Sequence, residues 1–349
     1  MKFGIFDYID LRAEAPARTL DERMALLRAA EDAGFRGYHL TEHHVTPLSL
    51  APSPNLFLAA AARETKRLRL GTLLYLLPLY NPVRLIEEVC MLDHLSHGRL
   101  DIGVGTGVSP FEFAALGEDF ATARDSFEET FEILYKGLTQ DRLAHQGRRW
   151  RHDGLAMVMR PVQKPLPPLW YGLRSDYGHA LAARYGMNVV TLGPDDRIAR
   201  SIALFRAAWR EHADERRRIG TGTEEPLIGA MRAVVVADTD EEAARIAGPA
   251  HEQWFESLCW LWKENGSFPP IALSPNFDEA TRSGALVAGS PATVRDALIG
   301  QARRIGFNYL VLHLAFGSLG HAAEMRSLAL FRDEVMPALA EIGAPVAVK

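Results

Sequence analysis

Three polar residues, Glu42-His43-His44, follow one another where an apolar segment over residues 37–43 predicts a strand. Side chains alternate along a strand, so His43 faces one side while Glu42 and His44 face the other. An imidazole titrates near neutrality and suits a proton donor or acceptor, with Glu42 or His44 to orient it. A hydrogen-bonded structural histidine is the plainer interpretation. A metal site is a third, although no spaced carboxylate partner is evident, and we predict no metal.

Two other predicted strands end in uncharged residues. The strand over 68–76 contains Leu73 and Leu74, and the strand over 100–105 ends at Gly105 and is followed by Thr106. Glycine allows a ligand to approach the backbone closely, so a flat apolar ligand could lie against these strand ends. Ordinary packing of the core is the alternative.

A predicted strand over 169–173 leads directly into a predicted helix over 176–185. Gly172, Arg174 and Ser175 lie at this junction. Backbone N–H groups at a helix N-terminus attract anions, and an arginine and a serine beside them outline a phosphate site. Ser175 would equally serve as an N-cap of the helix.

The elements that position these residues alternate along the whole chain. Strands are predicted over residues 3–8, 37–43, 68–76, 100–105, 169–173, 188–192, 228–237 and 309–315, with amphipathic helices between them. Eight strand–helix pairs predict an α/β fold, a (β/α)8 TIM barrel in which active sites lie at the C-terminal ends of the strands. A doubly wound open sheet is the rival, but no glycine-rich dinucleotide fingerprint follows the first strand.

We predict one domain over residues 1–349, with insertions near 141–168 and 264–289. The first insertion loses the helical pattern and indicates a loop or hairpin. The second is rich in Gly, Pro, Ser and Asn, and such long irregular segments are usually lids or disordered.

The predicted helix over 83–96 is apolar nearly all round. A helix on the outside of a barrel should face water on one side. We therefore expect a homodimer through this helix. Burial of the helix under the first insertion is the alternative.

Composition excludes several classes of protein. The chain has 349 residues and a net charge of -5, so it lacks the excess of positive charge that is typical of nucleic-acid-binding proteins. No apolar run approaches the roughly 18 residues that would cross a membrane, and the N-terminus does not resemble a signal peptide. Two cysteines, Cys90 and Cys259, fall in apolar helical patterns and indicate small buried side chains in a reducing compartment. We expect a cytoplasmic protein.

Taken together, the chain resembles the bacterial-luciferase-like flavin monooxygenases over most of its length. The motifs that carry the resemblance are Met1-Lys2-Phe3-Gly4, Glu42-His43-His44, Gly71-Thr72 through Pro78, Pro82-Val83-Arg84, Leu92-Asp93 with Gly98-Arg99, Ala182-Ala183 with Gly186, and Gly289-Ser290-Pro291. Each motif is short, but their order and spacing are specific in combination.

The resemblance implies roles for particular residues. His43 falls on the catalytic histidine of the family, and Leu73 and Leu74 fall where the family bends around the flavin ring, often through a non-proline cis peptide bond. Ser175 falls on a phosphate-binding serine, with Arg174 and Gly178 on neighbouring positions. Segment 264–289 falls on a mobile lid.

Two departures concern the flavin site. Gly105 and Thr106 stand where luciferase has a reactive cysteine and an arginine, and Arg174 stands where it has a glutamate. The arginine charge that is missing at Thr106 could be supplied by Arg174 from the other side. These departures argue against a light-emitting luciferase.

The resemblance further implies a two-component monooxygenase. Reduced FMN would arrive as a co-substrate from a separate flavin reductase and react with O2 to give a C4a-peroxyflavin, which would oxygenate a small hydrophobic substrate. The alternatives are a deazaflavin-dependent hydride transfer on the same barrel and a non-catalytic flavin-binding protein. We expect apolar groups of Tyr8, Leu74, Tyr80, Phe111 and Trp260 to line the mouth.

Overall fold

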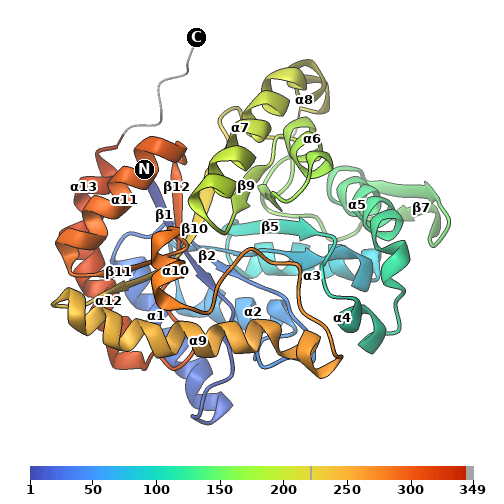
Figure 1. The fold of residues 1–349 in the computed structure, drawn as a ribbon. Coiled ribbons are helices and arrows are strands. Elements are labelled where there is room, and N and C mark those ends of the chain that lie inside the picture. Colours follow the sequence, from blue (N-terminus) through green and yellow to red (C-terminus); the bar gives the residue numbers. More distant parts are fainter. Residues whose placement is uncertain (221, 343–349) are drawn as a thin grey trace.

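Parallel strands close into a barrel in the computed structural model, which describes residues 1–220 and 222–342 (Figure 1). Each strand pairs with the next along the chain, and β10 pairs with both β9 and β12, so the ring is closed. The predicted (β/α)8 barrel is confirmed. The strands of the ring are β1 (Lys2–Asp7), β2 (Gly37–Leu40), β3 (Arg69–Thr72), β5 (Leu100–Gly105), β8 (Leu169–Gly172), β9 (Asn188–Thr191), β10 (Ile228–Val236) and β12 (Tyr309–His313).

Helices surround this ring (Figure 1). Several of them begin with proline, whose fixed φ and missing N–H suit the first helical turn. The helices are α1 (Pro16–Asp32), α2 (Pro54–Glu64), α3 (Pro82–Leu95), α4 (Pro110–Ala115), α5 (Ala123–Thr139), α6 (Asp176–Arg184), α7 (Asp195–Glu211), α8 (Ala213–Ile219), α9 (Asp240–Glu264), α10 (Phe277–Arg282), α11 (Pro291–Ile305), α12 (His321–Leu330) and α13 (Met336–Ala340), with short helical turns at Leu77–Leu79, Phe120–Thr122 and Phe331–Val335.

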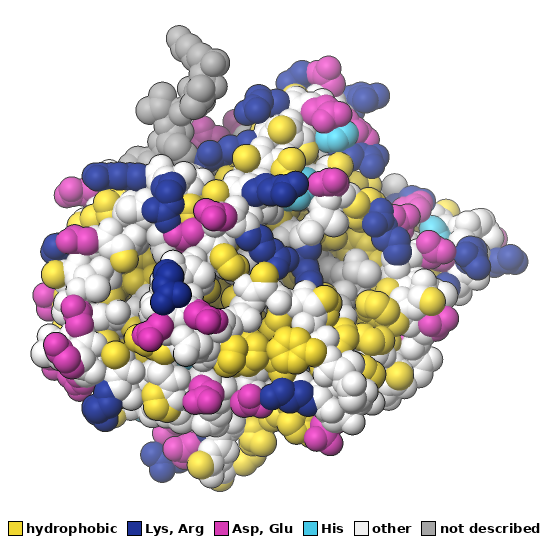
Figure 2. All heavy atoms as spheres, in the orientation of Figure 1, with side chains coloured by type: hydrophobic (Ala, Val, Ile, Leu, Met, Phe, Trp, Pro, Cys, Tyr) yellow, Lys and Arg dark blue, Asp and Glu magenta, His cyan; other side chains and the backbone are white. Residues whose placement is uncertain are grey.

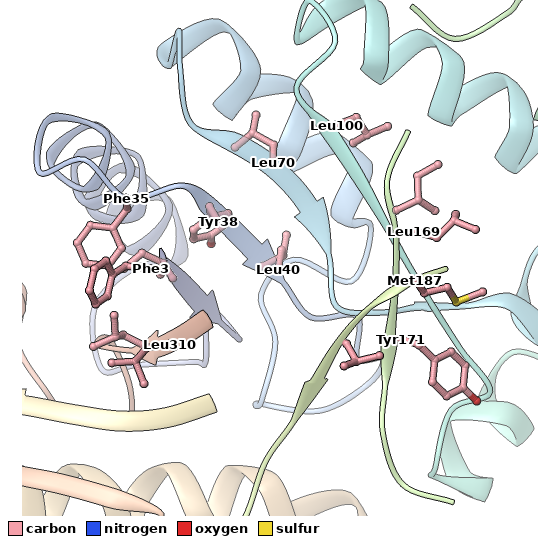
Figure 3. Packing of buried hydrophobic residues seen from close by; sticks show 14 of the residues in the cluster. Phe3, Phe35, Tyr38, Leu40, Leu70, Leu100, Leu169, Tyr171, Met187 and Leu310 are labelled. Carbon is pink, nitrogen blue, oxygen red and sulfur yellow. The ribbon is translucent and has the colours of Figure 1, made fainter. Parts of the chain in front are cut away.

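Alternation along the strands divides the core into two clusters. On β12, Leu310 and Leu312 belong to the cluster between the strands and the helices, whereas Tyr309 and Val311 belong to the cluster inside the barrel and under α9. Figure 3 shows part of the outer cluster, where Leu310 lies close to Phe3. Both faces of the strands are therefore buried, as a parallel barrel requires.

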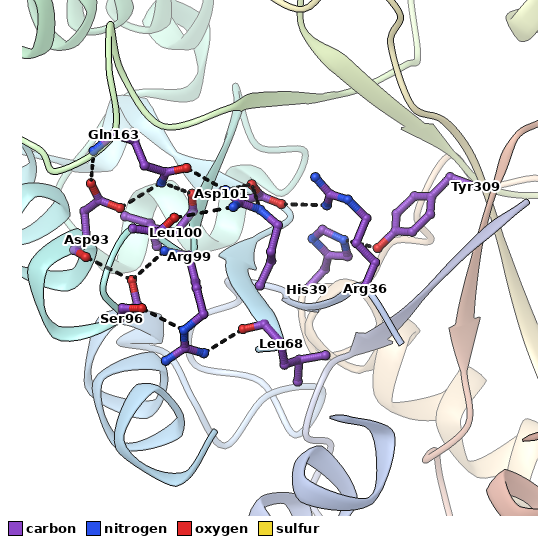
Figure 4. A network of polar contacts seen from close by, with 12 residues as sticks. Arg36, His39, Leu68, Asp93, Ser96, Arg99, Leu100, Asp101, Gln163 and Tyr309 are labelled. Carbon is purple, nitrogen blue, oxygen red and sulfur yellow. Dashed lines mark hydrogen bonds and ion pairs between the residues drawn. The ribbon is translucent and has the colours of Figure 1, made fainter. Parts of the chain in front are cut away.

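A polar network lies at the end of the barrel opposite the strand C-termini (Figure 4). His39 Nε2 lies 2.8 Å from the hydroxyl of Tyr309 inside the barrel. Arg36 and Arg69 both donate to the buried carboxylate of Asp101. Burial lowers the pKa of His39 to about 3, so this histidine is a neutral, hydrogen-bonded structural residue.

The two insertions differ in how far they match the prediction. The first contains a two-stranded antiparallel hairpin of β6 (Arg142–Gln146) and β7 (Arg151–Ala156), as expected. The second is less irregular than expected, because α10 and strand β11 (Leu286–Gly289) lie within it, and β11 pairs with the C-terminal half of β10. Within it, residues 265–276 and 283–285 lack helix and strand. The predicted strand over 68–76 is also divided, into β3 and β4 (Tyr75–Leu76).

Helix α3 has an exposed side that its sequence does not suggest. Arg84, Glu87, Met91 and His94 are exposed at helical spacing. The other apolar side chains are buried or partly buried within the chain, against a core that α2 and α5 complete. The argument that the helix lacks a water-facing side is therefore wrong. The homodimer itself stays a prediction.

Other expectations concern burial and length. Cys90 and Cys259 are free and buried, as predicted. Among the helices of the described residues, none combines the length and apolar character needed to cross a membrane.

Candidate active site

The C-terminal ends of the strands, α4, α9 and segment 265–276 enclose a pocket of about 480 Å³, part of it open to solvent. Figure 1 shows this segment crossing in front of the barrel after α9. On the same face, Figure 2 shows hydrophobic side chains gathered beside a group of Lys and Arg side chains. The pocket is lined by His43, Thr46, Leu48, Val108, Ser109, Glu112, Arg174, Leu258, Leu261, Trp262, Pro269, Pro270 and Ile271.

His43 is the predicted catalytic residue that reaches this pocket. Its Nδ1 lies 3.0 Å from Oε1 of Glu112, and its ring stacks on Tyr8 with centroids 5.7 Å apart. Because the carboxylate accepts, Nδ1 carries the proton, and Nε2 is the ring nitrogen left to exchange a proton. The imidazole is thus held in one plane and one tautomer.

Glu42 and His44 do not orient His43, contrary to expectation, because they bond each other and neither lines the pocket. Glu42 Oε1 lies 2.9 Å from His44 Nε2, and its Oε2 accepts from the backbone N–H of Leu76 and the hydroxyl of Tyr80, each at 3.0 Å. Burial lowers the pKa of His44, but the hydrogen bond and charge of Glu42 outweigh this effect and the net pKa is raised. These two residues secure the loop that carries His43.

Glu112 is a pocket-lining partner of His43 that the sequence did not single out. It lies on α4, one turn after Ser109, and also accepts from the backbone N–H of His44 at 2.9 Å. Burial raises its pKa, but the charge and hydrogen bond of His43 and the backbone bond outweigh burial and lower the pKa overall. Glu112 is therefore an ionised, buried carboxylate. No local pattern marks it, because its partner is 69 residues away along the chain.

The residues expected at the flavin ring lie together. The peptide bond between Leu73 and Leu74 is cis. The side chain of Leu74 covers two glycines of neighbouring strands, since a Cβ added at Gly105 or Gly172 would lie 2.5 or 3.2 Å from Leu74 Cδ1. These strand ends thus form a close-packed apolar platform at the barrel mouth.

The residues expected at the phosphate gather at the N-terminus of α6. Ser175 accepts from the backbone N–H of Gly178 at 3.3 Å, so it does cap the helix. Arg174 is exposed and lines the pocket. Although part of this side chain is accessible, partial loss of hydration and then the charge of Arg197 lower its pKa, so the two guanidinium groups repel each other.

Thr106 joins this region through the side chain of Tyr171, with which it forms a hydrogen bond. Gly178 packs on the same tyrosine, since a Cβ there would lie 2.6 Å from Tyr171 Cε1. The apolar platform, the helix N-terminus and the two arginines therefore fit a flat ring with an anionic tail.

The expected lining of the mouth is wrong, because none of the five side chains named for it lines this pocket: Tyr8, Leu74, Tyr80, Phe111 and Trp260. Trp260 is 39% exposed and does not line the pocket, because the helical period of α9 places Leu258, Leu261 and Trp262 on the inner face instead. Phe111 does not line it either, but packs edge-on against Trp262 with centroids 5.3 Å apart.

Comparison with known proteins places this site in a family. The sequence profile described as luciferase-like monooxygenase matches residues 1–309. An uncharacterised protein of Sinorhizobium fredii is 35% identical over 96% of both chains. The oxygenase component of a flavin-dependent trigonelline monooxygenase from Acinetobacter baylyi is 28% identical, over 98% of this chain and 96% of that protein. The chain belongs to the luciferase-like monooxygenase family.

Solved structures share the fold. Monooxygenase RslO1 from Streptomyces bottropensis superposes with a TM-score of 0.86 at 25% identity, over 97% of this chain and 99% of that one. The oxygenating constituent of 3,6-diketocamphane monooxygenase from Pseudomonas putida, in complex with FMN, gives 0.82 at 22% identity, over 99% of both chains. A coenzyme F420 dependent reductase from Methanopyrus kandleri gives 0.69 at 18%, over 97% of this chain and 99% of that one.

Proposed function

We propose that the chain is the oxygenase component of a two-component monooxygenase that uses reduced FMN and O2 to oxygenate a small, mainly apolar substrate. The observation that carries the proposal is the His43–Glu112 pair, which opens into an apolar pocket next to the Leu73–Leu74 platform. Relatives described as flavin-dependent monooxygenases support the same reaction.

In this proposal Leu73, Leu74, Gly105 and Gly172 hold the flavin ring. The phosphate is held by Thr106, Arg174, Ser175 and Gly178. Bound reduced FMN supplies the activation of O2.

The chain supplies the surroundings of the reaction. Nε2 of His43 accepts or returns a proton at the reacting centre, and Glu112 stabilises the imidazolium that forms. Segment 265–276 and Trp262 exclude water from the pocket, which limits side reactions.

In this proposal a separate NAD(P)H:flavin reductase supplies the reduced FMN. The relative from Acinetobacter supports this, because it is described as the oxygenase component of its monooxygenase. The free, buried state of Cys90 and Cys259 supports a reducing, cytoplasmic location.

A homodimer through the side of α3 is also part of the proposal. Exposed apolar side chains flank this helix: Leu56 is 77% exposed, Met91 54% and Val158 92%. Asn55 bonds Glu88, which joins α2 to α3 next to Leu56, so part of this surface is continuous. A dimer in light scattering that Met91→Glu converts to a monomer would support this assembly, and a monomeric wild type would contradict it.

The experiment for the cofactor is a titration of the chain with reduced FMN and with a reduced deazaflavin under anaerobic conditions. We expect tighter binding of FMN, followed by O2 consumption and oxygenated product when a reductase and an apolar substrate are supplied. A clear preference for the deazaflavin would favour hydride transfer, the chemistry suggested by the F420-dependent structural neighbour. FMN binding without product from any candidate substrate would favour a non-catalytic protein.

A further inference from the structure

Two buried polar atoms of pocket-lining residues have no partner among the described residues: Oγ of Ser109 and Oε2 of Glu112. Both residues line the pocket, and they are 4% and 1% exposed. A buried polar atom without a hydrogen bond is destabilising. Two such atoms in one pocket therefore indicate a ligand group that pairs with them.

Ser109 is free for a ligand because it does not cap its helix. It occupies the N-cap position of α4, yet its side chain makes no capping bond. By contrast, Ser290 at the start of α11 accepts from the backbone N–H of Thr293. The hydroxyl of Ser109 thus keeps both its donor and its acceptor capacity.

Glu112 has one engaged oxygen and one free oxygen. Oε1 is taken by Nδ1 of His43 and the backbone N–H of His44. Oε2 belongs to an ionised carboxylate and accepts only, so its complement must be a donor. Ser109 is the N-cap residue of α4, three residues before Glu112, and residues at this spacing lie on one side of a helix start.

The other lining residues indicate the chemical character of the rest of the ligand. Most of the other lining side chains are apolar: Leu48, Val108, Leu258, Leu261, Trp262 and Ile271. We propose that Ser109 and Glu112 form a subsite for the hydroxyl of an otherwise apolar substrate, so that the substrate class is apolar alcohols and phenols. This inference rests on the proposed function in taking this pocket as the substrate pocket.

Each polar group has its own task in this subsite. Glu112 Oε2 accepts the hydroxyl proton of the substrate, and Ser109 donates to the hydroxyl oxygen. A hydrocarbon would leave both groups unpaired. An ether would satisfy Ser109 alone, so the affinity order is alcohol, then ether, then hydrocarbon.

A calorimetric titration of the full chain with 4-butylphenol, 4-butylanisole and 4-butyltoluene tests this order. We expect each lost hydrogen bond to weaken binding roughly threefold to tenfold. Ser109→Ala should weaken the phenol and the anisole by that factor and leave the toluene unchanged. Ser290→Ala, which removes a real helix cap far along the chain, is the matched control and should leave all three affinities unchanged.

Several results would overturn the subsite. They are equal affinity for phenol and toluene, no binding of any probe, unchanged phenol affinity in Ser109→Ala, or tightest binding of 4-butylbenzoate, which would indicate that Arg174 selects a carboxylate. An FMN titration in parallel separates the two proposals. Loss of the probe order with FMN binding intact refutes the subsite alone, whereas the expected order without FMN binding refutes the proposed function alone.

Discussion

Nδ1 of His43 lies 3.0 Å from Oε1 of Glu112, and this contact joins the end of the second barrel strand to the short helix that follows the fourth. The same carboxylate oxygen accepts from the backbone N–H of His44. One buried anion therefore fixes both the ring and the backbone of the histidine. An imidazole held in this way loses little freedom when a proton moves at Nε2.

Replacement of His43 tests this arrangement directly. His43→Ala removes the proton-accepting nitrogen but leaves the platform for the flavin, so FMN binding should persist while product formation falls about 100-fold or more. Fluorescence titration with FMN and product analysis under a regenerating reductase measure the two quantities. Undiminished turnover would remove His43 from the mechanism.

Glu112→Gln is the companion variant. The amide keeps the shape of the side chain but no longer stabilises an imidazolium, so turnover should fall less than in His43→Ala and its dependence on pH should change. A pH profile identical to that of the wild type would show that Glu112 contributes only packing.

The close packing at Gly105 is the basis of a second prediction. A Cβ at Gly105 would lie 2.5 Å from Leu74 Cδ1, closer than real contacts allow, whereas a Cβ at Gly172 would lie 3.2 Å from the same atom. Gly105→Ala should therefore displace Leu74, lower the free energy of unfolding by about 1–3 kcal/mol and weaken FMN binding. Gly172→Ala is the control and should have the smaller effect in urea denaturation and in FMN titration. Equal effects would contradict the packing argument.

Much of the fold was predictable because the strands of a parallel barrel are buried on both faces and appear as short apolar runs. Strand β11 was missed because it has four residues and follows a segment rich in Gly and Pro, where no pattern distinguishes strand from loop. The exposed side of α3 was missed because Met91 is apolar yet faces outward.

The candidate site was predictable in part for a different reason. His43 lies at a strand end, and the barrel fold alone brings strand ends together. Glu112 could not be found in this way, because nothing in residues 109–115 indicates which strand end the helix will face. A contact across 69 residues depends on the completed fold.

Near its C-terminal end, segment 265–276 is joined to α9 by a partly buried hydrogen bond, which is the basis of a third prediction. His251 Nε2 lies 2.8 Å from the carbonyl oxygen of Ser274, and burial lowers the pKa of His251, so the neutral ring donates. His251→Phe keeps a ring but removes the donor, at a net cost of about 1 kcal/mol. Amide hydrogen exchange in 265–276 should become about fivefold faster, the factor that corresponds to this energy.

A matched histidine controls for loss of an imidazole. His94 Nε2 lies 2.9 Å from the carbonyl oxygen of Arg160, outside the pocket. His94→Phe should leave hydrogen exchange in 265–276 unchanged. Unchanged exchange in His251→Phe as well would mean that other contacts hold the segment.

The last prediction concerns a buried cluster of charges under the barrel mouth. Arg23 Nε lies 3.0 Å from Asp7 Oδ2, its Nη1 lies 3.0 Å from Glu324 Oε2, and Arg12 also contacts Glu324. Two cations are therefore already balanced by two carboxylates. A charge on Asp10, which is also buried, would be in excess.

Burial raises the pKa of Asp10 to about 7. It outweighs the charges of Arg23 and Arg12 and the N–H of Gly317, all of which lower this pKa. The unfolded chain releases this proton near pH 3.8, so the folded state binds more protons between pH 3.8 and 7 and loses stability as the pH rises through that window. Asp10→Asn stays neutral and avoids this loss. Its Tm should match the wild type near pH 4 and exceed it by several degrees above pH 7. A difference in Tm that does not change with pH would mean that Asp10 is ionised in the folded protein over the whole pH range. Arg12 and Arg23 would then balance the charges of three carboxylates.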